Sequence, residues 1–332
     1  TDDTTKAYFR SLVESQSLAQ LVGFENEAFI FPAVHHSFRF CILVLRGYKA
    51  STEQTNFVFF CRTMSHAHEK ERLFRLSSSD IALLNPNTFT CPIFRTNEDA
   101  EIAKSAYQRV PVLIDESVLC NPWGISFFRL VDMANDSHYF TETPANGRLP
   151  LFEAKMAHQY NHRWATYADV TTEEIRGGLA RNISIPELLD PSSNAIPRYW
   201  VPEDEVLRRL KVHSGRDNDD FAHSLESEKP LSSAAPQMPR WLLGFRDVCR
   251  AHDDRTAIFC ILPRVGVGHK MPLIFAGNAI PVVLRVGLYG NLNGLVFDYL
   301  VRQKLGGASL SYFILKQIPT LPPAAYCELA IS

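Results

Sequence analysis

The chain has 332 residues, of which 46% are hydrophobic and 21% charged, with a formal net charge of -2. This composition is typical of a globular protein with a normal core, and the length allows two or three domains. Seven scattered cysteines without Cys-x-x-Cys spacing argue against a zinc ribbon or a disulfide framework and favour the cytoplasm, and no apolar run approaches the roughly 18 residues that span a bilayer.

The charges are distributed unevenly along the chain. Residues 168–229 contain 13 Asp and Glu against 8 Lys and Arg, whereas residues 236–322 contain 10 Lys and Arg against 4 Asp and Glu. A basic C-terminal third attracts polyanions, although a solvated surface with a chance imbalance would give the same count.

The first 65 residues predict a helix followed by strands. The stretch TDDTTKAYFRSLVESQ begins with turn and cap residues and then places Ala7, Phe9, Leu12 and Val13 at roughly helical spacing. Three strand candidates follow, LAQLVGFEN, FRFCILVLRG and TNFVFFCRT. The second candidate is a nearly unbroken apolar run, which is typical of a strand covered on both faces. Since one helix and three strands cannot bury such faces, we expect the end of a larger α/β domain whose earlier strands are absent.

Further along the chain, TNEDAEIAKSAYQR predicts a helix capped by Thr96 and Asp99 and stopped by Pro111. The polar, acidic stretch 213–239 predicts a loop. TAIFCILPRV and IPVVLRVGLY are typical of strands, and LNGLVFDYLVRQKLGG predicts a helix that ends at its two glycines.

Residues 151–167, LFEAKMAHQYNHRWATY, concentrate polar side chains in a short stretch. Helical spacing would place an apolar stripe on one side and donor-rich side chains suited to phosphates and base edges on the other. A solvated amphipathic helix fits the same pattern. His158 and His162 stand four apart, but no Glu follows His158 and no third metal ligand is evident. The donor-rich side would contain Lys155, His158, Gln159, His162 and Arg163.

Two other motifs are weak by themselves. RVGVGHKMP contains a Gly-x-Gly pair without the strand, loop and helix of a phosphate site, so we interpret it as a tight turn. The NPNT sequence at 85–88 lacks the second proline and the aromatic residue of the Asn-Pro-Pro-aromatic loop of amino-methyltransferases. No nucleophile arrangement is recognisable, and no catalytic residue is assigned.

Several stretches, taken in order, resemble the C-terminal part of large adenine-specific DNA methyltransferases, including those fused to restriction nucleases. The most specific of these stretches are LLNPNTFTCPIFRTNEDAEIAKSAYQRVPVL and PLFEAKMAHQYNHRWATY. The end of the chain, LVFDYLVRQKLGGASLSYFILKQIPTLPP, also resembles the recognition domain of a type I specificity subunit.

The resemblance implies an α+β fold in three parts. Residues 1–65 would be the last strands of a Rossmann-like, S-adenosylmethionine-dependent catalytic domain, 66–167 a helical connector, and 168–332 the DNA target recognition domain. In such enzymes a flipped adenine is methylated while the recognition domain selects the sequence. Neither the glycine-rich cofactor loop nor the Asn-Pro-Pro-aromatic motif occurs here, so we expect no bound cofactor in this chain and no methylation by it alone.

The expected partners are duplex DNA and upstream methyltransferase domains, with or without a nuclease, of the same polypeptide. A non-catalytic protein-interaction module of a phage-defence complex is the alternative, which a large apolar surface patch would favour. Glu153 with Lys155 suits a structural ion pair. The candidate DNA contacts are Lys155, His158, Gln159, His162, Arg163, Arg240, Arg246, Arg264, Lys270, Arg302, Lys304 and Lys316.

Overall fold

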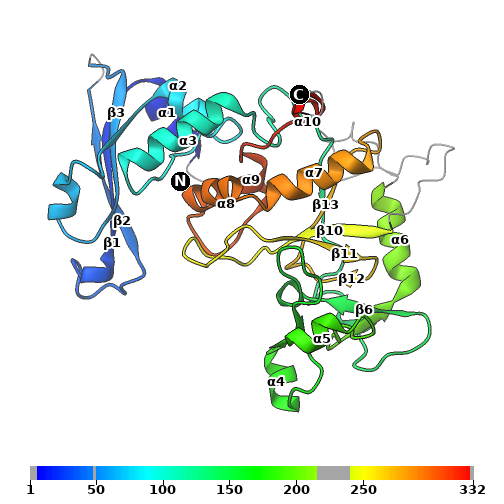
Figure 1. Cartoon of the computed structure of the whole chain (residues 1–332). Coiled ribbons are helices and arrows are strands. Elements are labelled where there is room, and N and C mark those ends of the chain that lie inside the picture. Colours follow the sequence, from blue (N-terminus) through cyan, green and yellow to red (C-terminus); the bar gives the residue numbers. More distant parts are fainter. Residues whose placement is uncertain (1–5, 48–49, 215–239, 330–332) are drawn as a thin grey trace. The chain divides into compact units, whose positions relative to one another are not determined.

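The computed structural model describes residues 6–47, 50–214 and 240–329 and has an α+β fold built from short helices and several small sheets (Figure 1). The chain divides into two compact units. Unit 1 comprises Thr1–Asn121, Tyr299–Gly306 and Phe313–Pro322, and unit 2 comprises Pro122–Asp298, Gly307–Tyr312 and Pro323–Ser332. This division does not coincide with the predicted boundaries after residues 65 and 167, whose functional meaning stays a prediction.

Unit 1 contains a four-stranded mixed sheet in the order β2-β1-β3-β4. Strand β1 is antiparallel to β2 and parallel to β3, and β3 is antiparallel to β4. The three predicted strands are therefore confirmed, as is the preceding helix α1, which buries Phe9 and Val13. The elements are α1 (Lys6–Glu14), β1 (Leu18–Glu25), η1 (Asn26–Ala28), β2 (Arg39–Leu45), β3 (Gln54–Cys61), η2 (Ser65–His68) and β4 (Phe74–Ser77).

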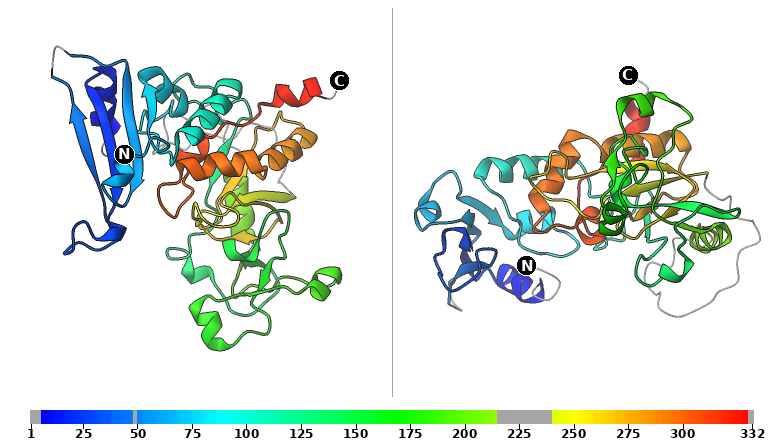
Figure 2. Two further views of the ribbon diagram at one scale, coloured as in Figure 1. Left: turned by 60° about the vertical axis from the view of Figure 1, so that its left-hand side comes forward. Right: turned by 90° about the horizontal axis from the view of Figure 1, so that it is seen from below.

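Strand β2 does not have the environment that its apolar sequence predicts. It lies at the edge of the sheet (Figure 2). Every residue from Cys41 to Leu45 is exposed, so both faces of the strand are open within the described part of the chain. Val58 of β3, by contrast, has no exposed surface. The prediction of a strand is confirmed, but the cover on both faces is absent from the described residues.

Helix α3 (Asn97–Arg109) begins where its capping residues predict. Thr96 accepts a hydrogen bond from the backbone N–H of Asp99, and Asp99 accepts one from the backbone of Thr96, which confirms the predicted capping box. The helix ends at Arg109, two residues before Pro111. With α1, the α-helices that fall wholly in unit 1 are α2 (Ser78–Leu84) and α3 (Asn97–Arg109).

Unit 2 contains a four-stranded sheet in the order β11-β10-β13-β5 and two smaller sheets, β12-β6-β9 and β7-β8. Its strands are β5 (Ser126–Phe128), β6 (Arg148–Phe152), β7 (Ala165–Thr166), β8 (Arg181–Asn182), β9 (Trp200–Pro202), β10 (Trp241–Phe245), β11 (Phe259–Pro263), β12 (Gly266–Val267) and β13 (Leu273–Phe275). Its helical segments are η3 (Ser137–Tyr139), η4 (Ala154–Met156), α4 (Thr172–Gly177), α5 (Ile185–Leu189), α6 (Glu203–Ser214), α7 (Val282–Leu292) and α10 (Pro323–Leu329).

Two further helices carry residues of both units. Helix α8 (Leu295–Lys304) contributes its first four residues to unit 2 and the others to unit 1, and α9 (Tyr312–Lys316) begins with one residue of unit 2. The predicted helix that ends at the glycine pair is confirmed, since α8 stops at Lys304, before Gly306. Glycine at this position ends helices readily because it lacks a side chain.

Two predictions of secondary structure in unit 2 are wrong. The apolar run IPVVLRVGLY forms α7 instead of a strand, and its buried residues Leu288 and Leu292 stand four apart, at helical spacing. The helix considered over 151–164 is also absent, because β6 continues to Phe152 and a single 3₁₀ turn follows it. The predicted loop over 213–239 lies almost wholly outside the described residues.

A hydrophobic core of unit 2 joins β6, β9, β10, β11 and β12 to α6. Gly266 lies in β12, where a Cβ atom would come within 2.5 Å of Val201 and 3.3 Å of Leu151. This glycine therefore allows the close approach of β12 to β6. The tight turn predicted in this motif is confirmed directly after β12, where the backbone N–H of Met271 donates to the carbonyl of Gly268 at 2.8 Å. In the described ranges 6–47, 50–214 and 240–329, no helix is long and apolar enough to cross a membrane.

Candidate nucleic-acid interface

The stretch that follows β6 forms a compact turn, which we call the 156–164 loop. The backbone N–H of Trp164 donates to the carbonyl of Met156 at 3.0 Å and closes the loop. At its tip, His158 and Asn161 exchange two backbone hydrogen bonds of 2.8 and 3.0 Å. Met156 is completely buried, so the loop has a rigid base in the core of unit 2.

Three side chains fix the loop to the rest of unit 2. The Arg246 guanidinium donates from Nε to the carbonyls of Ala154 and Ala157 at 3.1 and 2.9 Å. The Gln159 amide donates to the carbonyl of Ala257 at 3.0 Å. Two of the predicted DNA contacts, Arg246 and Gln159, therefore serve as internal supports of the loop.

The third support is the hydroxyl of Tyr289 in α7. It accepts a hydrogen bond from the backbone N–H of Tyr160 at 3.1 Å, and burial raises the pKa of this hydroxyl to about 12. A neutral phenol at this position keeps both its donor and its acceptor capacity at physiological pH. Gln159 and Tyr160, the two central residues of the tip, are thereby both hydrogen-bonded to other parts of unit 2.

The acidic member of the stretch is also internal. Glu153 accepts hydrogen bonds from the Tyr167 hydroxyl at 3.0 Å and from Arg198 Nε at 2.8 Å. Lys155 Nζ lies 3.7 Å from the same carboxylate and also donates to the carbonyl of Gly178, which confirms the predicted ion pair of Glu153 with Lys155. Burial, and then the Glu153 charge, raise the pKa of the Tyr167 hydroxyl. The negative charge of Glu153 is thus compensated within unit 2.

The outer side of the loop presents rings and donors to solvent. Tyr160 is 64% exposed and Trp164 is 36% exposed, while the half-buried His158 ring lies 4.4 Å from the Trp164 ring. Burial lowers the pKa of His158, and the positive charges of Arg246 and Arg255 lower it further. Neutral His158 is therefore the dominant form at physiological pH, and it is better suited to stacking than to pairing with phosphate.

The other histidine and the arginine of the stretch have different environments. His162 is exposed, although desolvation and then the Arg163 charge lower its pKa. Arg163 is half-buried and donates to the carbonyls of Leu188, Asp190 and Ser193 at 2.7 to 2.9 Å. These bonds satisfy carbonyls at and beyond the C-terminal end of α5, so Arg163 is a helix cap and not a free donor.

The predicted contacts from the basic third that lie in unit 2 differ in their availability. Arg240 is exposed, and Arg264 is half-buried with no polar partner in the described residues. Lys270 is half-exposed and lies 3.2 Å from the buried carboxylate of Asp247. Arg240 is the most open of the three, and Lys270 already has a counter-charge.

The predicted contacts that lie in unit 1 are largely used inside it. The Lys304 ammonium donates to the carbonyl of Leu84 and to Asn85 Oδ1 (2.7 Å), and burial lowers its pKa. Lys316 is mostly buried and pairs with Glu116 at 2.6 Å, and Arg302 is half-buried. An enclosed ammonium such as that of Lys304 has no access to a phosphate in this conformation.

The NPNT loop is closed by its own side chains. Asn85 donates to the carbonyl of Thr90 at 2.7 Å and accepts from Lys304. Asn87 donates to the carbonyl of Ile114 at 2.8 Å and accepts from the backbone of Glu116 at 2.7 Å. Both amides donate and accept hydrogen bonds within unit 1, so they serve to hold this loop in place.

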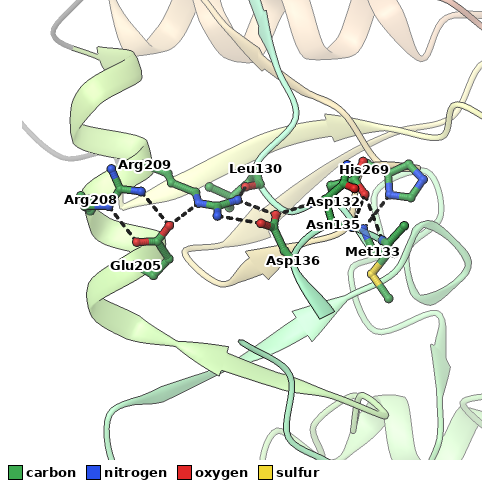
Figure 3. Close-up of polar contacts among 10 residues, drawn as sticks. Leu130, Asp132, Met133, Asn135, Asp136, Glu205, Arg208, Arg209 and His269 are labelled. Atoms are coloured by element: carbon green, nitrogen blue, oxygen red, sulfur yellow. Dashed lines mark hydrogen bonds and ion pairs between the residues drawn. The ribbon is translucent and has the colours of Figure 1, made fainter. Parts of the chain in front are cut away.

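Sequence reasoning missed a polar network between α6 and the segment after β5. The Arg209 guanidinium makes paired hydrogen bonds to Asp136 at 2.6 and 2.9 Å and also contacts Glu205 at 2.6 Å (Figure 3). It donates further to the carbonyl of Leu130 at 2.9 Å. The only sequence signal was an acidic first turn in a helix whose later turns are basic, which is common on solvated helices.

This network predicts a loss of stability in acid. Hydrogen bonds from Arg208 and Arg209 lower the pKa of Glu205 from 4.5 to about 2. The unfolded chain therefore binds more protons than the folded one between these values, so the stabilisation is complete above about pH 4.5 and disappears as the pH falls toward 2. Solvent screens this interaction, so we expect it to contribute about 1 kcal/mol to the free energy of unfolding above about pH 4.5. Glu205→Gln should abolish this contribution and its decline in acid, as measured by urea unfolding at several pH values.

Glu173→Gln is the matched control, because Glu173 is an exposed carboxylate of α4 without a polar partner in the described residues. Equal slopes of stability against pH for the two variants would show that the Arg209 network does not contribute.

In the described residues no group of three His, Cys, Asp or Glu side chains is placed to hold a metal ion. No protein-family model matches the chain, and no curated protein matches it. A crystal structure of the type IIG restriction endonuclease BpuSI is similar, with a TM-score of 0.29, 10% identity, and coverage of 97% of this chain and 38% of that chain. At this TM-score the similarity assigns neither a fold nor an activity, and the chain spans well under half of that enzyme.

Proposed function

We propose that the chain is the sequence-specific DNA recognition portion of an S-adenosylmethionine-dependent, adenine-specific DNA methyltransferase of a restriction–modification or phage-defence system. The resemblance of its sequence to the C-terminal part of such enzymes motivates the proposal. The basic third of the sequence, residues 236–322, supplies the charge that a DNA-binding surface requires.

The observation that carries the proposal is the 156–164 loop of unit 2. Its base is buried and its backbone is fixed by Arg246, Gln159 and Tyr289, while Lys155, His162 and aromatic rings face solvent. Donors and rings on a rigid support are suited to phosphates and bases, because little conformational freedom is lost on binding. Arg240, which is exposed, would add a phosphate contact.

The chain does not fit the cofactor of such an enzyme. Its sequence has no glycine-rich cofactor loop, and the amides of Asn85 and Asn87, in the loop closest in sequence to the methyltransferase motif, are satisfied inside unit 1. S-adenosylmethionine and the target adenine would accordingly be held by upstream domains of the same polypeptide. The chain alone binds DNA and does not methylate it.

A role in protein contact is the second candidate, and the exposed apolar surface of unit 1 favours it. Strand β2 is open on both faces, and the loop before it exposes Phe29, Phe31 and Phe38. Buried Asn26 fixes this loop, since its side chain bonds to the backbone of Phe31 and Val34 at 2.8 to 3.0 Å. A rigid apolar edge suits pairing with a further strand, such as one of the predicted upstream sheet.

Neutralising exposed cations tests the DNA proposal. We expect Lys155→Gln combined with Arg240→Gln to weaken binding to duplex DNA about tenfold at low salt, and to do so for every DNA sequence, because phosphate contacts carry no sequence information. Fluorescence anisotropy with a labelled duplex measures the affinity. Arg208→Gln is the control, since Arg208 is an exposed cation in the acidic segment. An equal loss in both proteins would contradict a specific basic surface.

A further inference from the structure

The tip of the 156–164 loop holds Tyr160 in an unusual backbone conformation. Its φ is +58°, in the left-handed region where glycine is favoured and a bulky side chain costs free energy. The ring is nevertheless 64% exposed, and its hydroxyl has no polar partner in the described part of the chain. A strained tyrosine that adds little to the core is a candidate for contact with a ligand.

The surrounding rings support Tyr160 without covering it. The Tyr289 ring meets it at a centroid distance of 5.2 Å and an angle of 66°, a T-shaped contact that leaves ring surface open. The Trp164 ring, with His158 beside it, is the second partly exposed aromatic surface of the same loop. Both surfaces belong to a loop whose base is buried, so they are preorganised.

The charges around the loop favour an anion. Arg246 and Arg255 are close enough to lower the pKa of His158, and Lys155 is about half-exposed next to the loop. Glu153 is mostly buried and paired with both Arg198 and Lys155, and Asp253 offsets part of the Arg246 charge. Aromatic surfaces combined with cations match the two parts of a nucleotide, a flat base and a phosphate.

The geometry points to a stacking site for an unpaired DNA base on Tyr160 and on the Trp164–His158 pair, with the adjoining phosphate near Lys155. This inference rests on the proposed DNA binding and extends it to a nucleotide that is not part of a regular duplex. A base without a pairing partner leaves the DNA helix at a low cost in free energy, because no base pair has to be broken. Stacking on an aromatic ring is possible for any base.

The experiment compares a regular duplex with the same duplex carrying one bulged, unpaired nucleotide. We expect the wild-type chain to bind the bulged DNA more tightly. Tyr160→Gly, which suits the backbone at this position, should weaken binding to the bulged DNA about tenfold more than binding to the regular duplex. Tyr160→Phe is the matched control, because it keeps the ring and should retain the preference.

The outcomes separate the two proposals. If the wild-type chain binds neither DNA at low salt, the proposed function fails and this inference fails with it. If it binds the regular duplex but Tyr160→Gly binds both DNAs as the wild type does, DNA binding stands and the stacking site is wrong. A preference for bulged DNA that persists in Tyr160→Gly also contradicts the site.

Discussion

Arg246→Met is expected to lower the free energy of unfolding by about 3 kcal/mol. The Arg246 guanidinium binds the carbonyls of Ala154 and Ala157, and it is mostly buried, so its pKa is lowered. Methionine fills a similar volume but donates no hydrogen bond. The carbonyl of Ala154 would keep the backbone N–H of Ala157 as a donor, whereas the carbonyl of the buried Ala157 would lose its partner, at a cost of about 1 to 3 kcal/mol. The loss would be measured by urea denaturation followed by circular dichroism.

Arg264→Met is the matched control for this substitution. Arg264 belongs to the same basic third and is half-buried, but it has no polar partner in the described residues. We expect its replacement to change stability by about 0.5 kcal/mol or less. If the two variants were equally stable, Arg246 would not support the 156–164 loop, and its role as a direct DNA contact would have to be reconsidered.

The second large effect concerns the sheet of unit 1. We expect Val58→Lys to lower stability by about 4 kcal/mol or to prevent folding, because Val58 is fully buried in β3 and a lysine there would have no counter-charge. Val44→Lys in β2 should change stability little, since Val44 is 42% exposed. Thermal unfolding of both variants provides the comparison.

Val44→Lys also tests whether the exposed edge strand β2 mediates contacts between chains. An exposed apolar edge strand promotes pairing between chains, and a lysine blocks it. Val44→Lys should therefore reduce self-association of the chain, as measured by light scattering over a range of concentrations. Unchanged self-association of Val44→Lys would show that β2 does not mediate contacts between chains. A strong loss of stability in this variant would show that β2 is covered in solution.

Local signals in the sequence predicted much of unit 1. Thr96 and Asp99 mark the start of α3 because a capping box depends only on residues three apart, and Pro111 marks its end in the same way. The strands β1, β2 and β3 followed from apolar runs of suitable length. The exposure of β2 could not be predicted, because an apolar run shows a tendency to be buried and not what covers it.

Unit 2 was less predictable because its decisive contacts join distant parts of the chain. The 156–164 stretch has helical spacing, yet its backbone is held by Arg246 and Tyr289, which are far away in sequence. The run that forms α7 is rich in valine and resembles a strand locally, but tertiary packing selects the helix.

The candidate DNA contacts also depend on the three-dimensional structure in a way that the sequence does not reveal. Composition identified the basic third but could not distinguish Arg163, which caps α5, or Lys304, which is enclosed in unit 1, from exposed cations such as Arg240. Charge counts report how many cations a segment has. Only the three-dimensional arrangement shows which of them already have partners.

The most direct test of DNA recognition is the affinity of the wild-type chain for duplex DNA as the salt concentration rises. Because each phosphate contact releases counterions, the logarithm of the binding constant should fall linearly and steeply with the logarithm of salt concentration. A slope that corresponds to several phosphate contacts is the expected result. Binding that is absent at low salt, or that does not change between low and moderate salt, would contradict the proposed function.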